Sequence, residues 1–445
     1  MTIAAIATAM AAGGIGIVRM SGDKAVKIAS KLFVGKSVEG MQSHTLHLGK
    51  IRHNDKIIDS VLLSVFKSPD SYTGEDVVEI NCHGGVHVCR MVLDACLAQG
   101  ATVAQPGEFT RRAFLSGKMN LTEAEAVADI ITATTESGVV VAASHLDKKL
   151  SDEIDAVRSG LVNALGHIMA GIDYSEEGVE DIEYSDLKNR LNTACETVAH
   201  LLKSADDGRI IKDGINTAIV GAPNVGKSSL FNAICGQDRA IVTEIAGTTR
   251  DMLEIQVSVR GCKLNLSDTA GIRESDDRVE KIGVDRSKSA IKNADIVFFV
   301  TDGSRKTNEQ DRQVMELVNH AATVCLINKC DMPQVENDLL KFAETIKVSA
   351  ITGEGLDGLF DYIANKFSIG DLTQKVVVTN PRHRECLLTS QRLLGGAVVA
   401  METRAPFDII AGEIELAISA LGEISGRTVN EEIIDNIFAN FCVGK

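Results

Sequence analysis

The chain has 445 residues, more than one ordinary hydrophobic core supports, and its length predicts about three domains. Apolar residues make up 44% of the composition and prolines are scarce, which excludes a largely disordered protein. The formal net charge of −15 repels nucleic acid at long range, so any contact with RNA needs a local basic patch or a basic partner. Arg111, Arg112 and Lys118 could supply such a patch, although a solvated face with scattered cations is the simpler interpretation.

The cysteines and the N-terminal segment favour a soluble chain in a reducing compartment. No C-x-x-C pair occurs among the ten cysteines, a pattern typical of reduced thiols and unlike a disulfide framework or a zinc site. Residues 1–20 are apolar, but Gly13, Gly14 and Gly16 interrupt them and no basic start precedes them. A membrane span needs about 20 consecutive apolar residues. We therefore expect a mature, cytoplasmic chain without stable membrane insertion.

The first 117 residues show an α+β pattern, in which short apolar runs alternate with turns rich in Gly, Ser, Asp and Asn. The runs Gly16–Val18, Ile57–Phe66 and Val77–Ile80 predict strands, and residues 24–33 and 86–99 predict helices. After residue 120 the residue pattern changes from short apolar runs to helical spacing. Between residues 121 and 202 the chain is rich in Ala, Glu and Leu, has apolar residues at spacings of three and four, and contains no proline, which predicts long helices.

A second α/β pattern follows the polar stretch 204–213. Strand-like runs there alternate with helical patterns, as in a parallel sheet covered by helices; these runs are 216–220, 262–267, 296–300 and 323–327. From about residue 375 to the end the pattern is helical again. Two helical regions that flank an α/β unit suggest that the unit is inserted into a helical domain.

The segment Gly221-Ala-Pro-Asn-Val-Gly-Lys-Ser228 matches the phosphate-binding pattern G-x-x-x-x-G-K-[ST], between an apolar run and a helical stretch. Its glycines let backbone N–H groups turn inward around phosphate oxygens, and the N-terminus of the following helix adds a favourable field. Lys227 would contact the β and γ phosphates, and Ser228 would offer its hydroxyl to Mg²⁺. A chance glycine-rich turn is the alternative, and the strand and helix around the motif argue against it.

Three further motifs follow in the order that a GTPase requires. Asp268-Thr-Ala-Gly271 comes at the end of an apolar run and would hold Mg²⁺ through water and place a Gly N–H near the γ phosphate. Asn328-Lys-Cys-Asp331 places a carboxylate where it can accept hydrogen bonds from guanine N1–H and the N2 amine, a donor pair that adenine lacks. Ser349-Ala350 would complete the base pocket through backbone N–H groups. The motifs together therefore predict GTP as the nucleotide.

The residue after the second motif bears on the mechanism. Ile272 stands where Ras-type GTPases have the Gln that orients the attacking water, and an isoleucine side chain has no polar atom for that task. Several nearby carboxylates could reach inward, and their spacing does not choose among them: Glu274, Asp276, Asp277 and Glu280.

These observations predict a multidomain α/β plus α architecture. The predicted parts are an N-terminal α+β domain (1–118), the first part of a helical domain (119–213), a Ras-like P-loop G domain (214–374), and the second part of the helical domain (375–445).

Motifs outside the nucleotide site resemble the bacterial tRNA modification GTPases of the MnmE (TrmE) family, and the resemblance runs from end to end. They are Gly13-Gly-Ile-Gly-Ile-Val-Arg19, Ser71-Tyr-Thr-Gly-Glu-Asp76, Cys82-His-Gly-Gly85, Pro106-Gly-Glu-Phe109, Asn120-Leu-Thr-Glu-Ala-Glu-Ala126, Gly247-Thr-Thr-Arg-Asp251 and the terminal Asn436-Ile-Phe-Ala-Asn-Phe-Cys-Val-Gly-Lys445.

For the N-terminal domain, the resemblance implies homodimerisation and binding of a tetrahydrofolate one-carbon donor, in its 5,10-methylene or 5-formyl form. It maps folate-contacting positions onto Arg19, Glu79, Lys118 and Lys445, and a suspected chemical role onto Cys442. Folate has a glutamate tail that suits cations and a pterin whose N–H donors suit a carboxylate. A strand carboxylate that simply faces water is the alternative interpretation of Glu79.

For the G domain, the resemblance implies activation by dimerisation of two nucleotide domains, with K⁺ in place of an arginine finger. Potassium would be bound by Asn224, Thr243, Ile245 and Thr248, and Mg²⁺ by Ser228 and Thr249, while Glu280 would position the nucleophilic water and Lys227 would assist catalysis. The complete expected GTP site comprises Asn224, Val225, Gly226, Lys227, Ser228, Ser229, Thr243, Glu244, Ile245, Ala246, Gly247, Thr248, Thr249, Asp268, Thr269, Ala270, Gly271, Asn328, Lys329, Asp331, Ser349 and Ala350.

The resemblance also implies a reaction and a partner. With the flavoprotein MnmG (GidA), in a heterotetramer or larger complex, the chain would install an aminomethyl or carboxymethylaminomethyl group on C5 of the wobble uridine of certain tRNAs. No dinucleotide fingerprint is visible, because Gly14-Ile-Gly16 is followed by Arg19 where the third Gly should stand, so FAD and NADH would belong to the partner. The net acidity likewise leaves tRNA binding mainly to that partner.

Two other classes of protein share some of these motifs. A ribosome-assembly or regulatory GTPase of the Era or Der type would use the same nucleotide motifs as a binding switch. A folate-dependent methyltransferase would keep the G domain only as a structural part. The helical frame and the end Phe441-Cys-Val-Gly-Lys445 argue against the first.

Overall fold

The computed structural model describes residues 1–173, 184–236, 243–244, 254–268, 291–318, 322–335, 342–367 and 375–445. The chain separates into two compact units. The first unit comprises residues 1–128, 145–163 and 415–445, and the second comprises residues 129–144 and 164–414.

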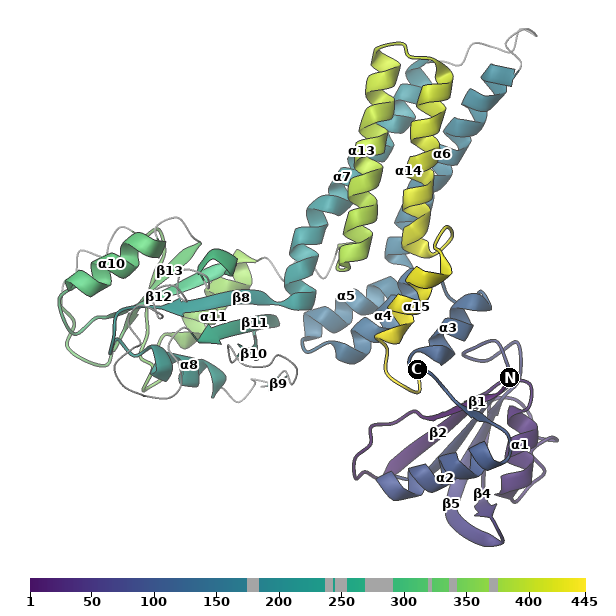
Figure 1. Ribbon diagram of the computed structural model, residues 1–445. Coiled ribbons are helices and arrows are strands. Elements are labelled where there is room, and N and C mark those ends of the chain that lie inside the picture. The colour runs from purple at the N-terminus through teal and green to yellow at the C-terminus, as the bar shows by residue number, and fades with distance from the viewer. Residues whose placement is uncertain are drawn as a thin grey trace. The chain divides into compact units, whose positions relative to one another are not determined.

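The first unit contains a seven-stranded sheet in the order β3-β4-β5-β6-β2-β1-β7 (Figure 1). Neighbouring strands are antiparallel except for β1 and β7. The strands are β1 Ile3–Ile6, β2 Ile15–Ser21, β3 Phe33–Val34, β4 Thr45–His53, β5 Lys56–Phe66, β6 Val77–His83 and β7 Thr102–Val103. The α+β pattern and the predicted strands therefore form.

Two helices, α1 Ala25–Leu32 and α2 Val86–Ala98, pack on one face of this sheet and form its core with the inward side chains of β2, β5 and β6. Successive side chains of a strand point to opposite sides of the sheet, so every second residue lies on the face away from α1 and α2. That face exposes Leu46 and Leu48 on β4 and Leu62 on β5. Both predicted helices are confirmed.

The end of the chain returns to the N-terminal residues within this unit. Helices α3 Glu108–Leu115 and α15 Glu431–Ala439 share an apolar cluster with the start of α4 Leu121–Thr132. Phe438 and Phe441 supply its aromatic contacts, with ring centroids 5.1 Å apart. Thr122 Oγ1 also donates to the carbonyl of Ile424, 3.0 Å away. The C-terminal residues are thereby held beside the N-terminal sheet.

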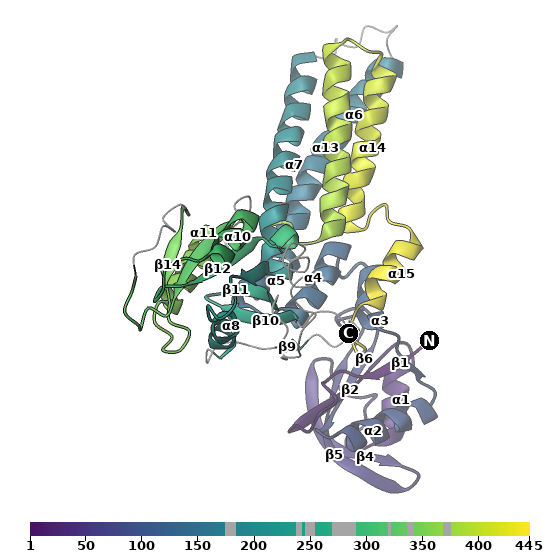
Figure 2. The same cartoon turned by 60° about the vertical axis from the view of Figure 1, so that its left-hand side comes forward.

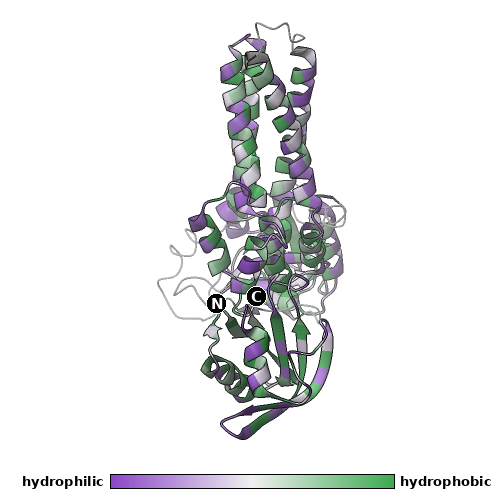
Figure 3. Ribbon diagram, turned by 90° about the vertical axis from the view of Figure 1, so that its right-hand side faces the viewer, coloured by the Kyte–Doolittle hydropathy of each residue, from purple (hydrophilic) through white to green (hydrophobic). Residues whose placement is uncertain are grey.

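The predicted helical regions form helices, and the long ones carry both hydrophilic and hydrophobic residues along their length (Figure 3). They are α5 Glu136–Leu146, α6 Lys149–Asp173, α7 Tyr184–Asp213, α13 Pro381–Glu402 and α14 Phe407–Ser425. The polar stretch 204–213 is itself helical and forms the last turns of α7. Asn380 caps α13, because its side chain accepts from the N–H of Arg382 and Pro381 occupies the first helical position.

The second unit holds another seven-stranded sheet, in the order β14-β13-β12-β8-β11-β10-β9. The five strands from β14 to β11 pair in parallel, and β10 and β9 add antiparallel pairs. The strands are β8 Ile215–Val220, β9 Thr243–Glu244, β10 Glu254–Val259, β11 Cys262–Asp268, β12 Ile296–Asp302, β13 Thr323–Asn328 and β14 Thr345–Lys347. The four predicted strands are confirmed, and each is one or two residues longer than its apolar run.

Helices cover both faces of this sheet, and its central strands are therefore buried on both sides. On β12, Phe298 and Val300 pack with α8 Lys227–Cys235 and α11 Leu356–Lys366, whereas Val297 and Phe299 face α10 Glu309–Val318. This two-sided burial explains why β12 is a continuous apolar run in the sequence. Across the described ranges, no helix is long and apolar enough to cross a bilayer.

Helices α7 and α13 lie side by side (Figures 1 and 2), and the residues just before α13 approach α7 at a glycine. A Cβ on Gly208 would lie 2.1 Å from the carbonyl oxygen of Val378 and 2.8 Å from a methyl carbon of Val377. Backbone and packed side chains cannot yield at such distances. The close approach therefore requires glycine in the middle of a helix.

We predict that Gly208→Ala destabilises the protein by about 1–3 kcal/mol, because the added methyl group overpacks this contact. Gly166→Ala is the matched control on α6, since nothing lies within 4 Å of its added Cβ and alanine has the higher helix propensity. Thermal unfolding of both variants checks this. Equal melting temperatures in the two variants would show that α7 can shift away from Val378.

Candidate nucleotide site

The phosphate-binding motif joins the C-terminal end of β8 to the N-terminus of α8, at the carboxyl edge of the parallel sheet. Two of its glycines are needed for space. A Cβ on Gly221 would lie 2.3 Å from the carbonyl oxygen of Val300, and one on Gly226 would lie 2.3 Å from Asn328 Nδ2. Gly226 also has φ +97°, a conformation that side chains disfavour. The loop can therefore approach the ends of β12 and β13 closely.

Lys227 lies across this loop. Its Nζ donates to the carbonyl oxygens of Gly221 at 2.9 Å and Ala222 at 2.8 Å, which fixes a positive charge at the helix N-terminus. Ser228 and Ser229 are exposed in the first turn of α8, and Val225 is buried in the core. The arrangement concentrates N–H groups and one cation, the combination that binds phosphate.

Asn328, the last residue of β13, connects the phosphate-binding loop to the Ser349-Ala350 segment. Its buried side chain donates from Nδ2 to the carbonyl of Val225 at 2.9 Å and accepts at Oδ1 from the N–H of Ala350 at 3.0 Å. Ser349 is buried, and its N–H donates to Glu354 O. Three motifs, of which the first lies about a hundred residues before the other two, thus meet through one amide.

Asp331 follows on the same loop and is exposed, as a residue that binds a base edge must be. The N–H of Cys330 donates to the carbonyl of Val348, which ties this loop to the segment before Ser349. Lys329 has φ +64° and points its Nζ to Asp302 Oδ2 at 2.6 Å and to the Asn224 carbonyl at 3.4 Å.

Sequence reasoning missed Asp302. The predicted strand 296–300 stopped two residues short of it, although a carboxylate at the end of a parallel strand beside the phosphate-binding loop was a usable signal. Burial opposes ionisation of Asp302, but hydrogen bonds from Lys329 and Ser304 outweigh it and lower the pKa of the carboxyl group. Asp302 therefore stays charged beside Lys329.

Part of the predicted site lies outside the described residues. Thr243 and Glu244 form β9, and Asp268 ends β11 at the same edge as the phosphate-binding loop. These three residues are described. The other predicted residues of these segments lie outside the described ranges: Ile245, Ala246, Gly247, Thr248, Thr249, Thr269, Ala270, Gly271, Ile272, Glu274, Asp276, Asp277 and Glu280.

A second cluster of predicted residues lies in the first unit. Arg19 on β2 pairs with Glu79 on β6, Nε to Oε1 at 2.7 Å, and both side chains are largely buried. Arg19 also donates to the carbonyl of Gly444 at 3.3 Å. The Arg19 guanidinium lies 5.7 Å from the ring centroids of Tyr72 and Phe109. The end of the chain therefore meets the ion pair on the N-terminal sheet.

The C-terminal tail is held through its backbone. The N–H of Phe109 donates to the carbonyl of Lys445 at 3.2 Å, and the N–H of Gly107 donates to that of Cys442 at 3.4 Å. Gly444 has φ +94°, and a Cβ there would lie 2.5 Å from the carbonyl of Ile6. Burial and the nearby Arg19 lower the pKa of Lys445.

Two of the predicted residues have exposed side chains. Cys442 has an exposed side chain. Lys118 is exposed just beyond α3, and no hydrogen bond or ion pair joins it to Arg19, Glu79 or Lys445 among the interactions described.

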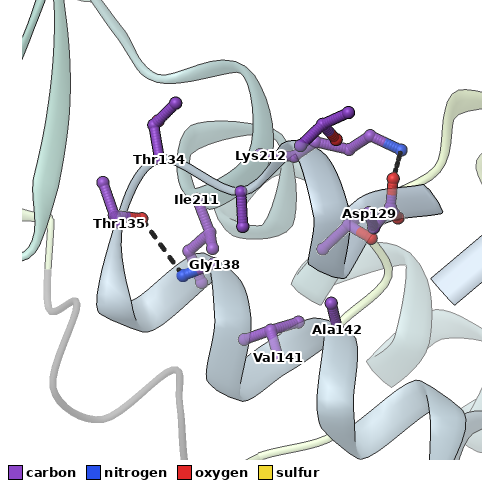
Figure 4. A pocket seen from close by; sticks show the side chains of 11 residues that line it. Asp129, Thr134, Thr135, Gly138, Val141, Ala142, Ile211 and Lys212 are labelled. Carbon is purple, nitrogen blue, oxygen red and sulfur yellow. Dashed lines mark hydrogen bonds and ion pairs between the residues drawn. The ribbon is translucent and has the colours of Figure 1, made fainter. Parts of the chain in front are cut away.

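A small pocket lies among α4, α5 and α7 in the second unit (Figure 4). The ion pair between Lys212 and Asp129, 2.8 Å long, borders it, and the Thr135 hydroxyl accepts from the N–H of Gly138. Its volume of about 50 Å³ is far below the roughly 300 Å³ at which small-molecule sites begin. The pocket is therefore too small for a nucleotide.

We predict that Asn328→Ala weakens binding of GDP by about tenfold or more, because it leaves the Val225 carbonyl and the Ala350 N–H without their buried partner. Isothermal titration with GDP measures this. Asn293→Ala, at an exposed position of the same unit, serves as the control and should bind normally. Unchanged affinity in Asn328→Ala would mean that the two loops hold their positions without this amide.

Comparisons with known proteins agree along the whole chain. The family model described as "GTP-binding protein TrmE N-terminus" matches residues 2–118, and the "MnmE helical domain" model matches residues 121–442. The tRNA modification GTPase MnmE of Clostridioides difficile (strain 630) is 44% identical over 454 residues, covering 100% of this chain and 99% of that protein. The protein of the same name from Alkaliphilus oremlandii (strain OhILAs) is 42% identical over 456 residues, with the same coverage.

Among solved structures, the G domain of the FeoB iron transporter of T. maritima matches 35% of this chain and 98% of its own length, at 27% identity and a TM-score of 0.25. The family models and the full-length relatives carry the assignment. The chain is a GTP hydrolase that belongs to the MnmE family of tRNA modification GTPases.

Proposed function

We propose that this chain is a K⁺-activated GTPase that acts with an MnmG (GidA) flavoprotein on certain tRNAs. Together they would add an aminomethyl or carboxymethylaminomethyl group to C5 of the wobble uridine, position 34, using a tetrahydrofolate one-carbon donor. The observation that carries the proposal is the contact of the C-terminal tail with the Arg19–Glu79 ion pair, in which Arg19 donates to the Gly444 carbonyl. A GTPase that served only as a switch would have no need of this second polar site.

The charges around the tail suit a folate. Arg19 and the partly buried amine of Lys445 offer cations to its glutamate tail, and Glu79 can accept from the N–H donors of its pterin. Lys118 would join the site only at its edge, because its side chain is exposed beyond α3. Cys442, exposed on the tail, would lie near the one-carbon unit.

The face of the N-terminal sheet opposite α1 and α2 supports a homodimer. A row of paired residues crosses this face from the exposed Leu46 through Ser64 and Glu79 to Arg19, where the C-terminal tail covers it. Leu48 and Ile15 on the same face are 75% and 67% exposed, which is unusual for large apolar side chains gathered on one surface. A second copy of the chain would cover these residues and enclose the folate site between two sheets.

In the G domain, GTP would bind with Mg²⁺ held by Ser228 and Thr249. K⁺ would be bound by Asn224, Thr243, Ile245 and Thr248, where it supplies positive charge to the phosphates. The exposed Asn224 side chain supports this role, because its backbone is fixed at φ +63° at the tip of the loop. Glu280 would position the water. Charge stabilisation of this kind changes GTPase rates by about 10³ to 10⁵.

The proposal assigns the chain's parts as follows. Residues 1–118 bind folate and dimerise, residues 119–213 and 375–445 form the helical domain, and residues 214–374 form the inserted G domain. FAD and NADH would be bound by the flavoprotein in a heterotetramer or larger complex, which also makes most contacts with tRNA. Dimerisation of two G domains would couple GTP hydrolysis to the modification step in the cytoplasm.

Potassium dependence tests the nucleotide part of the proposal. We predict that the purified chain hydrolyses GTP at least about tenfold faster in K⁺ than in Na⁺ at equal ionic strength, because K⁺ neutralises developing phosphate charge. Asn224→Ala should lose this stimulation, and Glu280→Ala should hydrolyse slowly in either salt. Equal rates of the unaltered chain in both salts would exclude the K⁺ role of Asn224.

Removal of the last four residues tests the second site. The shortened chain should keep its GTP turnover in K⁺ and lose wobble modification in a reconstituted reaction with the flavoprotein, because Lys445 and the backbone carbonyls that hold the tail are gone. Nucleoside analysis of the tRNA gives the readout. Modification by the shortened chain would contradict the folate site, and modification by Lys227→Ala would indicate a methyltransferase whose G domain is only structural.

A further inference from the structure

Asp302 ends β12 where the phosphate-binding loop meets the segment from Asn328 to Asp331. In the sheet, β12 lies between β8 and β13, and Asp302 is directly opposite Asn328. Its side chain is only 7% exposed, and Oδ2 lies 2.6 Å from Lys329 Nζ. The same ammonium lies 3.4 Å from the carbonyl oxygen of Asn224. One cation thus joins the end of β12 to the tip of the phosphate-binding loop.

The Asp302 carboxylate is itself held rigidly. Its Oδ1 accepts from the N–H of Ser304 at 2.9 Å and from the Ser304 hydroxyl at 2.6 Å. Arg305 Nε lies 4.0 Å from Oδ2, and the same guanidinium donates to the buried Asp311. These donors keep the carboxylate charged and aimed at Lys329.

Lys329 depends on such a partner. Its side chain has four rotatable bonds, so that an ammonium without a fixed anion would sample many positions. Its backbone adopts φ +64°, which is uncommon outside glycine, and Gln334 Nε2 donates to its carbonyl at 2.9 Å. Gln334 therefore holds the backbone of Lys329, and Asp302 holds its ammonium group.

We propose that Asp302 is a positioning residue for nucleotide binding, which holds the ammonium of Lys329 in the geometry that receives a guanine nucleotide. This inference rests on the proposed GTP site and extends it to a residue outside the four nucleotide motifs. Asp302 contacts Lys329 and is not placed to contact the reacting phosphates, so it influences the site only through the position of the Lys329 ammonium. It therefore affects affinity for GDP and GTP alike, and it leaves the rate of the bound complex unchanged.

The test compares Asp302→Asn with the unaltered full-length chain. Asparagine has the same size but no charge, and loss of a charged hydrogen bond that organises a binding loop weakens binding by about tenfold. We expect the Kd for GDP and the KM for GTP both to rise about tenfold, with kcat within about twofold. Asp357→Asn is the matched control, because Asp357 pairs with Arg260 in the same unit and is 86% exposed. It should change neither constant.

A double substitution separates positioning from general stability. In a Lys329→Met background, Asp302→Asn should cause no further loss of GDP affinity, since its effect passes through the ammonium. An equal loss in both backgrounds overturns the proposal, and so does a fall in kcat with KM unchanged. Ser304→Ala provides a milder variant if Asp302→Asn does not fold, since it removes one donor to Oδ1. It should raise KM about threefold at constant kcat, and an unchanged KM would overturn the proposal.

The experiment also separates this inference from the function on which it rests. An unaltered chain that bound no GDP would contradict the proposed nucleotide site itself. An unaltered chain that bound GDP normally, together with an Asp302→Asn variant of equal affinity, would overturn only the positioning role of Asp302.

Discussion

The nucleotide site depends on the parallel pairing of β12 with β8 and β13. Parallel neighbours end at the same edge of a sheet, so the loops that follow them meet there whatever their distance in sequence. Asn328 and Lys329 use this edge to reach the phosphate-binding loop, the first through a buried amide and the second through an ammonium held by Asp302. The two-sided burial of β12 fixes the strand that carries Asp302. Burial of β12 in the core therefore fixes where Asp302 lies, and with it the position of the Lys329 ammonium.

The first unit uses a different constraint, the return of the C-terminal tail to the N-terminal sheet. Phe438 and Phe441 anchor α15 and the residues after it against α3 and α4. Backbone bonds from Gly107 and Phe109 then fix the last four residues, so that the Gly444 carbonyl reaches Arg19. Because the tail is bound mainly through its main chain, its position needs small residues where it passes close to other backbone, as Gly444 does at Ile6. The proposed folate site thus brings together residues from both ends of the sequence.

Two close backbone approaches within the second unit have different consequences. At Gly226 the missing side chain lets Asn328 contact the phosphate-binding loop, and at Gly208 it lets α7 pack against the segment before α13. The first shapes a site and the second shapes a helix pair. The same physical property of glycine thus positions a binding loop in one place and sets the packing of the surrounding frame in the other.

The class of the fold, most strands and helices, and the nucleotide motifs could all be predicted from the order of the residues. This was possible because these features are local: apolar periodicity sets each element, and the pattern from Gly221 to Ser228 needs only a strand before it and a helix after it. The three-dimensional contacts were needed to show that the Gly444 carbonyl reaches Arg19, that residues 204–213 continue α7, and that Asp302 supports Lys329. Each of these follows from contacts between residues distant in the chain or from the packing of whole elements; the strand-end position of Asp302 was a local signal, but its pairing with Lys329 was not.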